Sequence, residues 1–167
     1  AITDDRPGVT RDRLYAEVWW DGRRLTLVDT GGYLPGTHDT LTDAVALQAE
    51  AAVMEADLVL LVCDATVPPT DLDRRLAEFV LRSGKPCLLA ANKLDTAERE
   101  SATAELHGLG LGPPQPVSAA TGRRSGDLLA AIVARLGAGQ TADEAAGEGP
   151  VRVVLAGRPN VGKSTLM

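Results

Sequence analysis

The feature that most constrains this chain is residues 157–164, Gly-Arg-Pro-Asn-Val-Gly-Lys-Ser, which match the pattern G-x-x-x-x-G-K-[ST]. Residues 151–156, directly before it, are mostly β-branched or aliphatic, which predicts a buried strand that leads straight into the loop. This order is the context that a phosphate-binding loop requires, because its backbone N–H groups and the following helix N-terminus face the anion. The sequence therefore predicts a fold organised around a phosphate site.

Each residue of this loop has an expected part in binding a nucleotide. Lys163 supplies a positive charge for the β- and γ-phosphates, and Ser164 offers its hydroxyl group to Mg²⁺. The alternative is a glycine-rich turn that follows a strand by chance, and it does not explain why strand, glycines and Lys-Ser pair occur together. The expected nucleotide-binding residues here are Gly157, Asn160, Val161, Gly162, Lys163, Ser164 and Thr165.

The rest of the chain alternates between strand and helix patterns. Residues 13–20 and 24–28 alternate in polarity around Asp21-Gly22, which predicts a hairpin. Buried strands are expected at 57–64 and 86–91 and a brief one at 115–117, helices at 43–56, 70–83, 98–106 and 128–136, and a loop from 30 through 42. The pattern predicts an α/β fold with a doubly wound, mostly parallel sheet and one antiparallel hairpin strand.

Two short motifs near the N-terminal end suit the chemistry of phosphates. Asp29 ends a predicted strand and is followed three residues later by Gly32, so Asp29 can hold Mg²⁺ through water while the Gly32 N–H meets the γ-phosphate. Thr10 lies in a turn-rich segment and can offer its hydroxyl and carbonyl groups to Mg²⁺ and to the attacking water. Taken alone, the Asp29 motif also fits an ordinary turn at the end of a strand.

Two further motifs suit recognition of a guanine base. A carboxylate at Asp95 can accept hydrogen bonds from the N1–H and 2-amino groups of guanine, which adenine cannot offer together. The stem of Lys93 can lie over the base, Asn92 can brace the loops, and Ser118-Ala119-Ala120 can offer a backbone N–H to the guanine oxygen. The alternative for Asp95 is that it caps the following helix.

Composition excludes some classes of protein and sets the expected compartment. The net charge of −6 and the pI near 4.9 argue against a nucleic-acid surface, and no apolar run reaches the length of a membrane span. Cys63 and Cys87 each lie in an apolar strand-like run, which predicts reduced, buried thiols. We expect a cytoplasmic protein without membrane contact. The chain lacks an initial Met and stops two residues after Thr165, so we also expect a piece truncated at both ends.

Taken together, the motifs resemble those of one family of bacterial GTPases. Residues 7–12, 29–32, 92–95 and 118–120 resemble the first G domain of the Der (EngA) family, the tandem-G-domain GTPases of the Era-like branch, from its first switch onward. Residues 157–164 resemble the phosphate loop that opens the second G domain. The resemblance covers essentially the whole chain and implies a P-loop GTPase-type fold.

The family resemblance also implies an activity, cofactors and a partner. It implies hydrolysis of GTP to GDP with Mg²⁺, coupled to assembly of the large ribosomal subunit, although the KH-like domain that the family uses there has no counterpart in this sequence. The implied catalytic residues are Thr10, Asp29, Gly32 and Lys163, with Ser164, Thr10 and Asp29 at Mg²⁺. Tyr33 stands where ordinary small GTPases have a water-orienting Gln, and the resemblance implies a K⁺ ion near Asn160 instead.

The order of the motifs divides the chain in an unusual way. Residues 1–136 are interpreted as a G domain without its own phosphate loop, 137–149 as a flexible linker, and 150–167 as the first strand and phosphate loop of a second G domain. We expect residues 151–156 to dock between the strands ending at Asp29 and Asp64 and to complete a hybrid nucleotide site. The competing outcome is that residues 150–167 trail off as a disordered stub.

Three functional interpretations remain open at this point. The first is a GTP-binding hydrolase truncated at both ends. The second is a catalytically silent scaffold whose nucleotide site is split between two incomplete domains. The third, a permuted GTPase, is weakened because few residues follow Ser164 to form the next helix.

Overall fold

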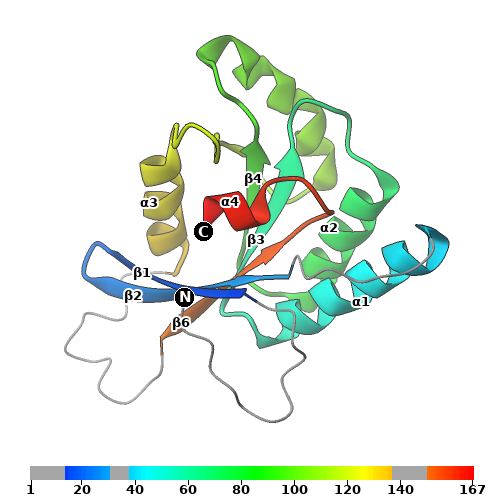
Figure 1. Ribbon diagram of the computed structural model, residues 1–167, viewed down its shortest axis with the longest axis horizontal. Coiled ribbons are helices and arrows are strands. Elements are labelled where there is room, and N and C mark those ends of the chain that lie inside the picture. Colours follow the sequence, from blue (N-terminus) through cyan, green and yellow to red (C-terminus); the bar gives the residue numbers. More distant parts are fainter. Residues whose placement is uncertain (1–13, 31–37, 137–149) are drawn as a thin grey trace.

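The computed structural model describes residues 14–30, 38–136 and 150–167, with backbone only for 38–45 and 97–102, and these residues form one six-stranded sheet covered by helices on both faces (Figure 1). The strand order is β1-β2-β6-β3-β4-β5. The strands are β1 (Leu14–Trp20), β2 (Arg23–Asp29), β3 (Leu58–Asp64), β4 (Cys87–Asn92), β5 (Gln115–Pro116) and β6 (Val151–Ala156). The helices are α1 (His38–Glu55), α2 (Asp71–Ser83), the 3₁₀ helix η1 (Ala97–Leu109), α3 (Ser125–Leu136) and α4 (Lys163–Leu166).

The hairpin expected from the sequence is present, and it is the antiparallel part of the described sheet. β1 pairs with β2 in a register that runs from Leu14 opposite Asp29 to Trp20 opposite Arg23. Asp21 and Gly22 form the turn with φ values of 50° and 73°, the left-handed values that a two-residue hairpin turn needs. The other strand pairs, β2–β6, β6–β3, β3–β4 and β4–β5, are parallel, so the expected fold class is confirmed.

β6 lies in the middle of the sheet although it comes last in the sequence. Its residues pair in parallel with β2, from Leu25 opposite Val151, and with β3, from Leu58 opposite Val153. The start of the strand is fixed by Asp57, whose N–H donates to Arg152 O at 3.0 Å and whose Oδ2 accepts from Arg152 N at 2.8 Å. Figure 1 shows β6 running between β2 and β3, which is the position expected for it from the sequence.

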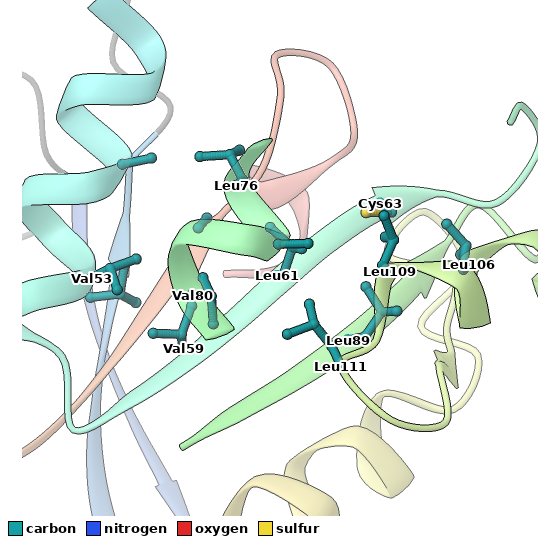
Figure 2. Packing of buried hydrophobic residues seen from close by; sticks show 14 of the residues in the cluster. Val53, Val59, Leu61, Cys63, Leu76, Val80, Leu89, Leu106, Leu109 and Leu111 are labelled. Carbon is teal, nitrogen blue, oxygen red and sulfur yellow. The ribbon is translucent and has the colours of Figure 1, made fainter. Parts of the chain in front are cut away.

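Two apolar clusters hold the layers together, one on each face of the sheet. Helices α1, α2 and η1 cover one face, where Val53, Val59 and Leu76 belong to a fully buried cluster (Figure 2). α3 covers the other face with Leu128 and Ile132. Every residue of β3 is buried, which explains its continuous apolar sequence, because a parallel strand covered on both faces has no polar side.

The boundaries of α2 agree with the sequence, whereas α1, η1 and α3 extend beyond the expected ranges. α2 begins after Thr70, whose side chain accepts from Asp73 N, and ends at Gly84 with φ 68°, as its capping residues predict. α1 begins at His38, so the loop expected through residue 42 is wrong in its second part. The first turn of α1 carries polar residues, and a search for apolar periodicity does not detect such a turn.

Some expectations concern other parts of the chain. The residues 137–149, interpreted as a linker, lie outside the described residues.

Across the described ranges, none of the helices combines the length and apolar character needed to cross a bilayer.

Candidate nucleotide-binding site

The candidate site lies where four neighbouring parallel strands end. The carboxyl ends of β2, β6, β3 and β4 present Asp29, the loop after Ala156, Asp64 and Asn92 along one edge of the sheet. Strands of a parallel sheet direct their following loops to the same edge, where ligands of α/β proteins bind. Because β6 occupies the central position, residues more than a hundred positions apart in sequence meet here.

The phosphate-loop sequence adopts a backbone that only glycine fits at two points. Gly157 has φ 150°, and a Cβ atom there would overlap the carbonyl oxygen of Val62 on β3. Gly162 has φ 94°, and a Cβ atom there would overlap Nδ2 of Asn92. Asn160 also has a positive φ, 63°, and is exposed. The loop is therefore packed tightly against β3 and β4, and Gly162 leads directly into α4.

Lys163 is folded against the backbone of its own loop. Its Nζ donates to the carbonyl oxygens of Gly157 and Arg158, both at 2.9 Å, and the residue is 5% exposed. Burial lowers the pKa of Lys163, while the charges of Asp29 and Asp73 oppose this shift. An ammonium group has three N–H donors, so these two contacts leave one donor for an anion at the loop.

Ser164 and Asp29 bring two oxygen groups to one point of the site. The hydroxyl of Ser164 donates to Oδ2 of Asp29, which is 1% exposed at the end of β2. A hydroxyl beside a carboxylate fits Mg²⁺, which proteins bind with one or two carboxylates together with substrate phosphates. Among the described residues, no group of three or more His, Cys, Asp or Glu side chains gathers at a possible metal position.

Asn92, the last residue of β4, joins the phosphate loop to the loop at 118–119. Its Nδ2 donates to Val161 O in the phosphate loop at 2.6 Å, and its Oδ1 accepts from Ala119 N at 2.9 Å. The side chain is 2% exposed, so both bonds lie away from bulk water. The Ala119 N–H, expected to be available to a base, is engaged by Asn92 in this arrangement.

Asp95 is held by the neighbouring loop and does not take the capping position. Its Oδ1 accepts from the hydroxyl of Ser118 at 2.6 Å, while the N-cap of η1 is Thr96. Ser118 is fully buried, and Asp95 is exposed. The alternative that Asp95 caps the helix is therefore wrong, and its carboxylate is oriented by Ser118 at the surface of the site.

Sequence reasoning did not anticipate the contacts that Lys93 and Arg158 make with two acidic residues beside the phosphate loop. Lys93 Nζ donates to Asp64 Oδ2 at 2.8 Å, and Arg158 lies 3.8 Å from the same oxygen. Arg158 Nε also lies 3.4 Å from Asp73 Oδ2, at ion-pair distance but without the direction of a hydrogen bond. The sequence signal for these contacts was Asp64 at the end of the apolar strand β3. Burial of an unpaired carboxylate is unfavourable, so such a residue indicates a cationic partner.

The structure brings most of the predicted site residues together. Residues 157–164 bond to Asp29 and Asn92, and Asn92 in turn accepts from Ala119 N. Thr165 is exposed on α4, where its N–H donates to Gly162 O. Thr10, Gly32 and Tyr33 lie outside the described residues.

This fold and site define a class: a P-loop nucleotide-binding domain of the GTPase type. The family described as 50S ribosome-binding GTPase matches residues 1–93, more than half of the chain, and the chain belongs to that family.

The relatives that this chain matches agree with its membership of the family. The chain is 49% identical over its full length to GTPase Der of Salinispora arenicola and 44% identical to GTPase Der of Myxococcus xanthus. It spans 36% and 38% of the length of these two relatives.

Solved structures of related fold also exist. Era in complex with MgGDPNP and a segment of 16S ribosomal RNA has a TM-score of 0.63 at 24% identity, over 84% of this chain and 49% of that one. An Era variant of Aquifex aeolicus bound to GDP·AlF4⁻ has the same TM-score at 25% identity, over 84% of this chain and 50% of that one.

Proposed function

We propose that this chain binds GTP and GDP at the carboxyl edge of its sheet and hydrolyses GTP there. The observation that carries the proposal is the position of β6 between β2 and β3, which places the phosphate loop beside Asp29 and Asn92. A split, silent site would leave these groups apart. The similarity to proteins named GTPase Der supports the same function.

The base is proposed to be guanine because of how Asp95 is held. Ser118 donates to Oδ1 of Asp95, and because an ionised carboxylate has about four lone-pair sites, Asp95 can still accept from the two adjacent donors of guanine. Lys93 would lie over the base. Because Asn92 engages the Ala119 N–H, a guanine oxygen would take its hydrogen bond from a neighbouring N–H of the loop at 118–120.

The phosphates are proposed to lie over residues 157–164, with hydrolysis assisted by charge. Lys163 would place its remaining N–H donor on a phosphate oxygen, and the loop N–H groups would hold the others. Ser164 and Asp29 would hold Mg²⁺, which supplies positive charge next to the phosphates. Thr10 and Gly32 are proposed to act on the attacking water and the γ-phosphate, and Asn160 to bind K⁺.

The domain division and the biological partner are also proposals. Residues 1–136 would be one G domain, 137–149 a linker, and 150–167 the first strand and phosphate loop of a second, which here completes the sheet of the first. The family description supports the large ribosomal subunit as the partner. Work on ribosomal subunits would place the protein in the cytoplasm.

The base specificity can be tested by replacing Asp95 with Asn. The amide of Asn replaces one acceptor oxygen of Asp95 with an NH₂ donor, which opposes the donors of guanine. The same NH₂ group suits xanthine, which has a carbonyl where guanine has its 2-amino group. We expect Asp95→Asn to weaken GTP binding by about 2–4 kcal/mol and to raise the relative affinity for XTP. Isothermal titration with both nucleotides measures this change.

A matched control separates this effect from a general loss of charge. Asp71→Asn removes a carboxylate whose side chain is fully exposed on α2 and should leave both affinities unchanged. If Asp95→Asn keeps the wild-type preference for GTP over XTP, guanine is not recognised by this carboxylate and the proposal fails.

A further inference from the structure

Charged side chains link the base-recognition motif to the phosphate loop. Asp64, at the end of β3, accepts from Lys93 at 2.8 Å through Oδ2 and lies 3.8 Å from Arg158 through the same oxygen. Arg158 continues to Asp73 in the first turn of α2. The carbonyl of Arg158 in turn accepts from Lys163 Nζ at 2.9 Å. One carboxylate oxygen therefore faces both Lys93 of the base-recognition motif and Arg158 of the phosphate loop.

We propose that Asp64 is a positioning residue that orients Lys93 for the base and Arg158 for the phosphate loop, so that the two halves of the site are set by one carboxylate. This inference rests on the proposed binding of guanine nucleotides. It assigns a role to Asp64 that goes beyond the proposed contacts with nucleotide, because Asp64 acts through its two cationic partners.

The two oxygens of Asp64 have separate partners. Oδ1 accepts from the N–H and hydroxyl groups of Thr66, at 3.0 and 2.6 Å, and so closes the turn after β3. Oδ2 faces the two cations. The structural task and the positioning task of this side chain can therefore be separated by experiment.

Asp64 keeps its charge although it lies in a shielded place. Burial alone would raise the pKa of Asp64, but the hydrogen bonds from Lys93 and Thr66 outweigh burial, and the pKa is lowered. The side chain of Asp64 is only 10% exposed, whereas Lys93 is 41% exposed and has water as an alternative partner. A well-held carboxylate beside a partly exposed ammonium group restricts the lysine to one place, which reduces the entropy that binding would otherwise have to remove.

The test is the affinity of the chain for GDP with Asp64→Asn. The amide keeps an oxygen for Thr66 but turns an NH₂ group toward Lys93 and Arg158, so donors face donors. We expect the Kd for GDP to rise about tenfold or more, since hydrogen bonds to charged groups are involved. The control Thr66→Val removes the hydroxyl from the other oxygen and should leave the Kd within about twofold, because this residue contacts only Oδ1.

A double-mutant cycle separates positioning from loss of structure. If Asp64 acts through Lys93, Asp64→Asn should change the Kd much less in a Lys93→Met background than in the wild type. A wild-type protein that binds no GDP overturns the proposed function itself. A wild-type protein that binds GDP while Asp64→Asn binds it equally well, or while the two substitutions are additive, overturns the positioning role alone.

A second cycle leaves Asp64 in place, in case Asp64→Asn does not fold. Lys93→Met and Arg158→Met remove its two cationic partners one at a time and together. Because both cations share Oδ2, their effects on the Kd for GDP should deviate from additivity. Additive effects of these two substitutions contradict the shared carboxylate.

Discussion

The amide of Asn92 offers the sharpest single test of how the site is held together. Asn92→Ala removes the Nδ2 group that donates to Val161 O and the Oδ1 atom that accepts from Ala119 N. These two hydrogen bonds tie the phosphate loop and the loop at 118–119 to β4. Both partner groups stay behind in a region where Asn92 itself is 2% exposed. The substitution therefore leaves backbone groups without partners.

The size of the effect follows from these two groups. Each buried backbone group that loses its partner destabilises the fold by about 1–3 kcal/mol. The Val161 bond is fully buried and the Ala119 bond only partly, so water can replace part of the second. We expect the free energy of unfolding to fall by about 2–4 kcal/mol.

Chemical denaturation followed by circular dichroism measures this change. Asn92→Asp refines the test, because it keeps an acceptor for Ala119 N but places an oxygen against Val161 O, and it should also be destabilised. Gln115→Ala is the control, since that side chain makes an exposed bond to Pro113 O, and it should change stability by less than about 0.5 kcal/mol. A change of that small size for Asn92→Ala would refute the bracing role.

Two further predictions concern the phosphate loop. Gly157→Ala would drive a Cβ atom into the carbonyl oxygen of Val62, so thermal melting should show that the free energy of unfolding falls by about 2 kcal/mol or more. The control Gly108→Ala, whose Cβ atom meets open space, should be nearly neutral. Equal melting temperatures for the two variants contradict the close packing. For Lys163, the pKa is lowered in the folded protein, so the unfolded chain binds the proton more tightly between that pKa and 10.5. The stability of the wild type relative to Lys163→Met should therefore rise with pH in that window, and a difference that falls or stays constant in denaturation at several pH values contradicts it.

The sequence predicts the sheet well because its strands have two distinct signatures. Continuous apolar runs at β3 and β4 occur where both faces are covered, and alternation at β1 occurs where one face is open. The central place of β6 could be inferred because a gap between two parallel strands leaves unpaired backbone groups, and one further strand of suitable character was available. The start of α1 could not be inferred from the sequence, because apolar periodicity does not detect a polar first turn.

A site residue could be predicted where a sequence motif fixes its type. Its contacts could not be predicted where they depend on how other helices and strands pack beside it. The bracing by Asn92 follows from its motif, and Asn92 bonds to Val161 O and Ala119 N. The contact of Arg158 with Asp73 depends on how α2 packs beside the loop, and no local pattern encodes this distance. The same holds for the place of Lys93 on Asp64, which needs the parallel pairing of β3 with β4.

The central claim is that β6 is a built-in part of the sheet and thereby assembles one guanine-nucleotide site. Hydrogen exchange measured by mass spectrometry, with and without GDP, tests both halves of this claim at once. We predict that residues 153–155 exchange as slowly as β3, because a central strand opens only with the whole sheet, and that GDP slows exchange at 157–164 and 92–95. Fast exchange at 153–155 in a chain whose β3 is protected, or an unchanged pattern at both loops with GDP in excess, would contradict the claim.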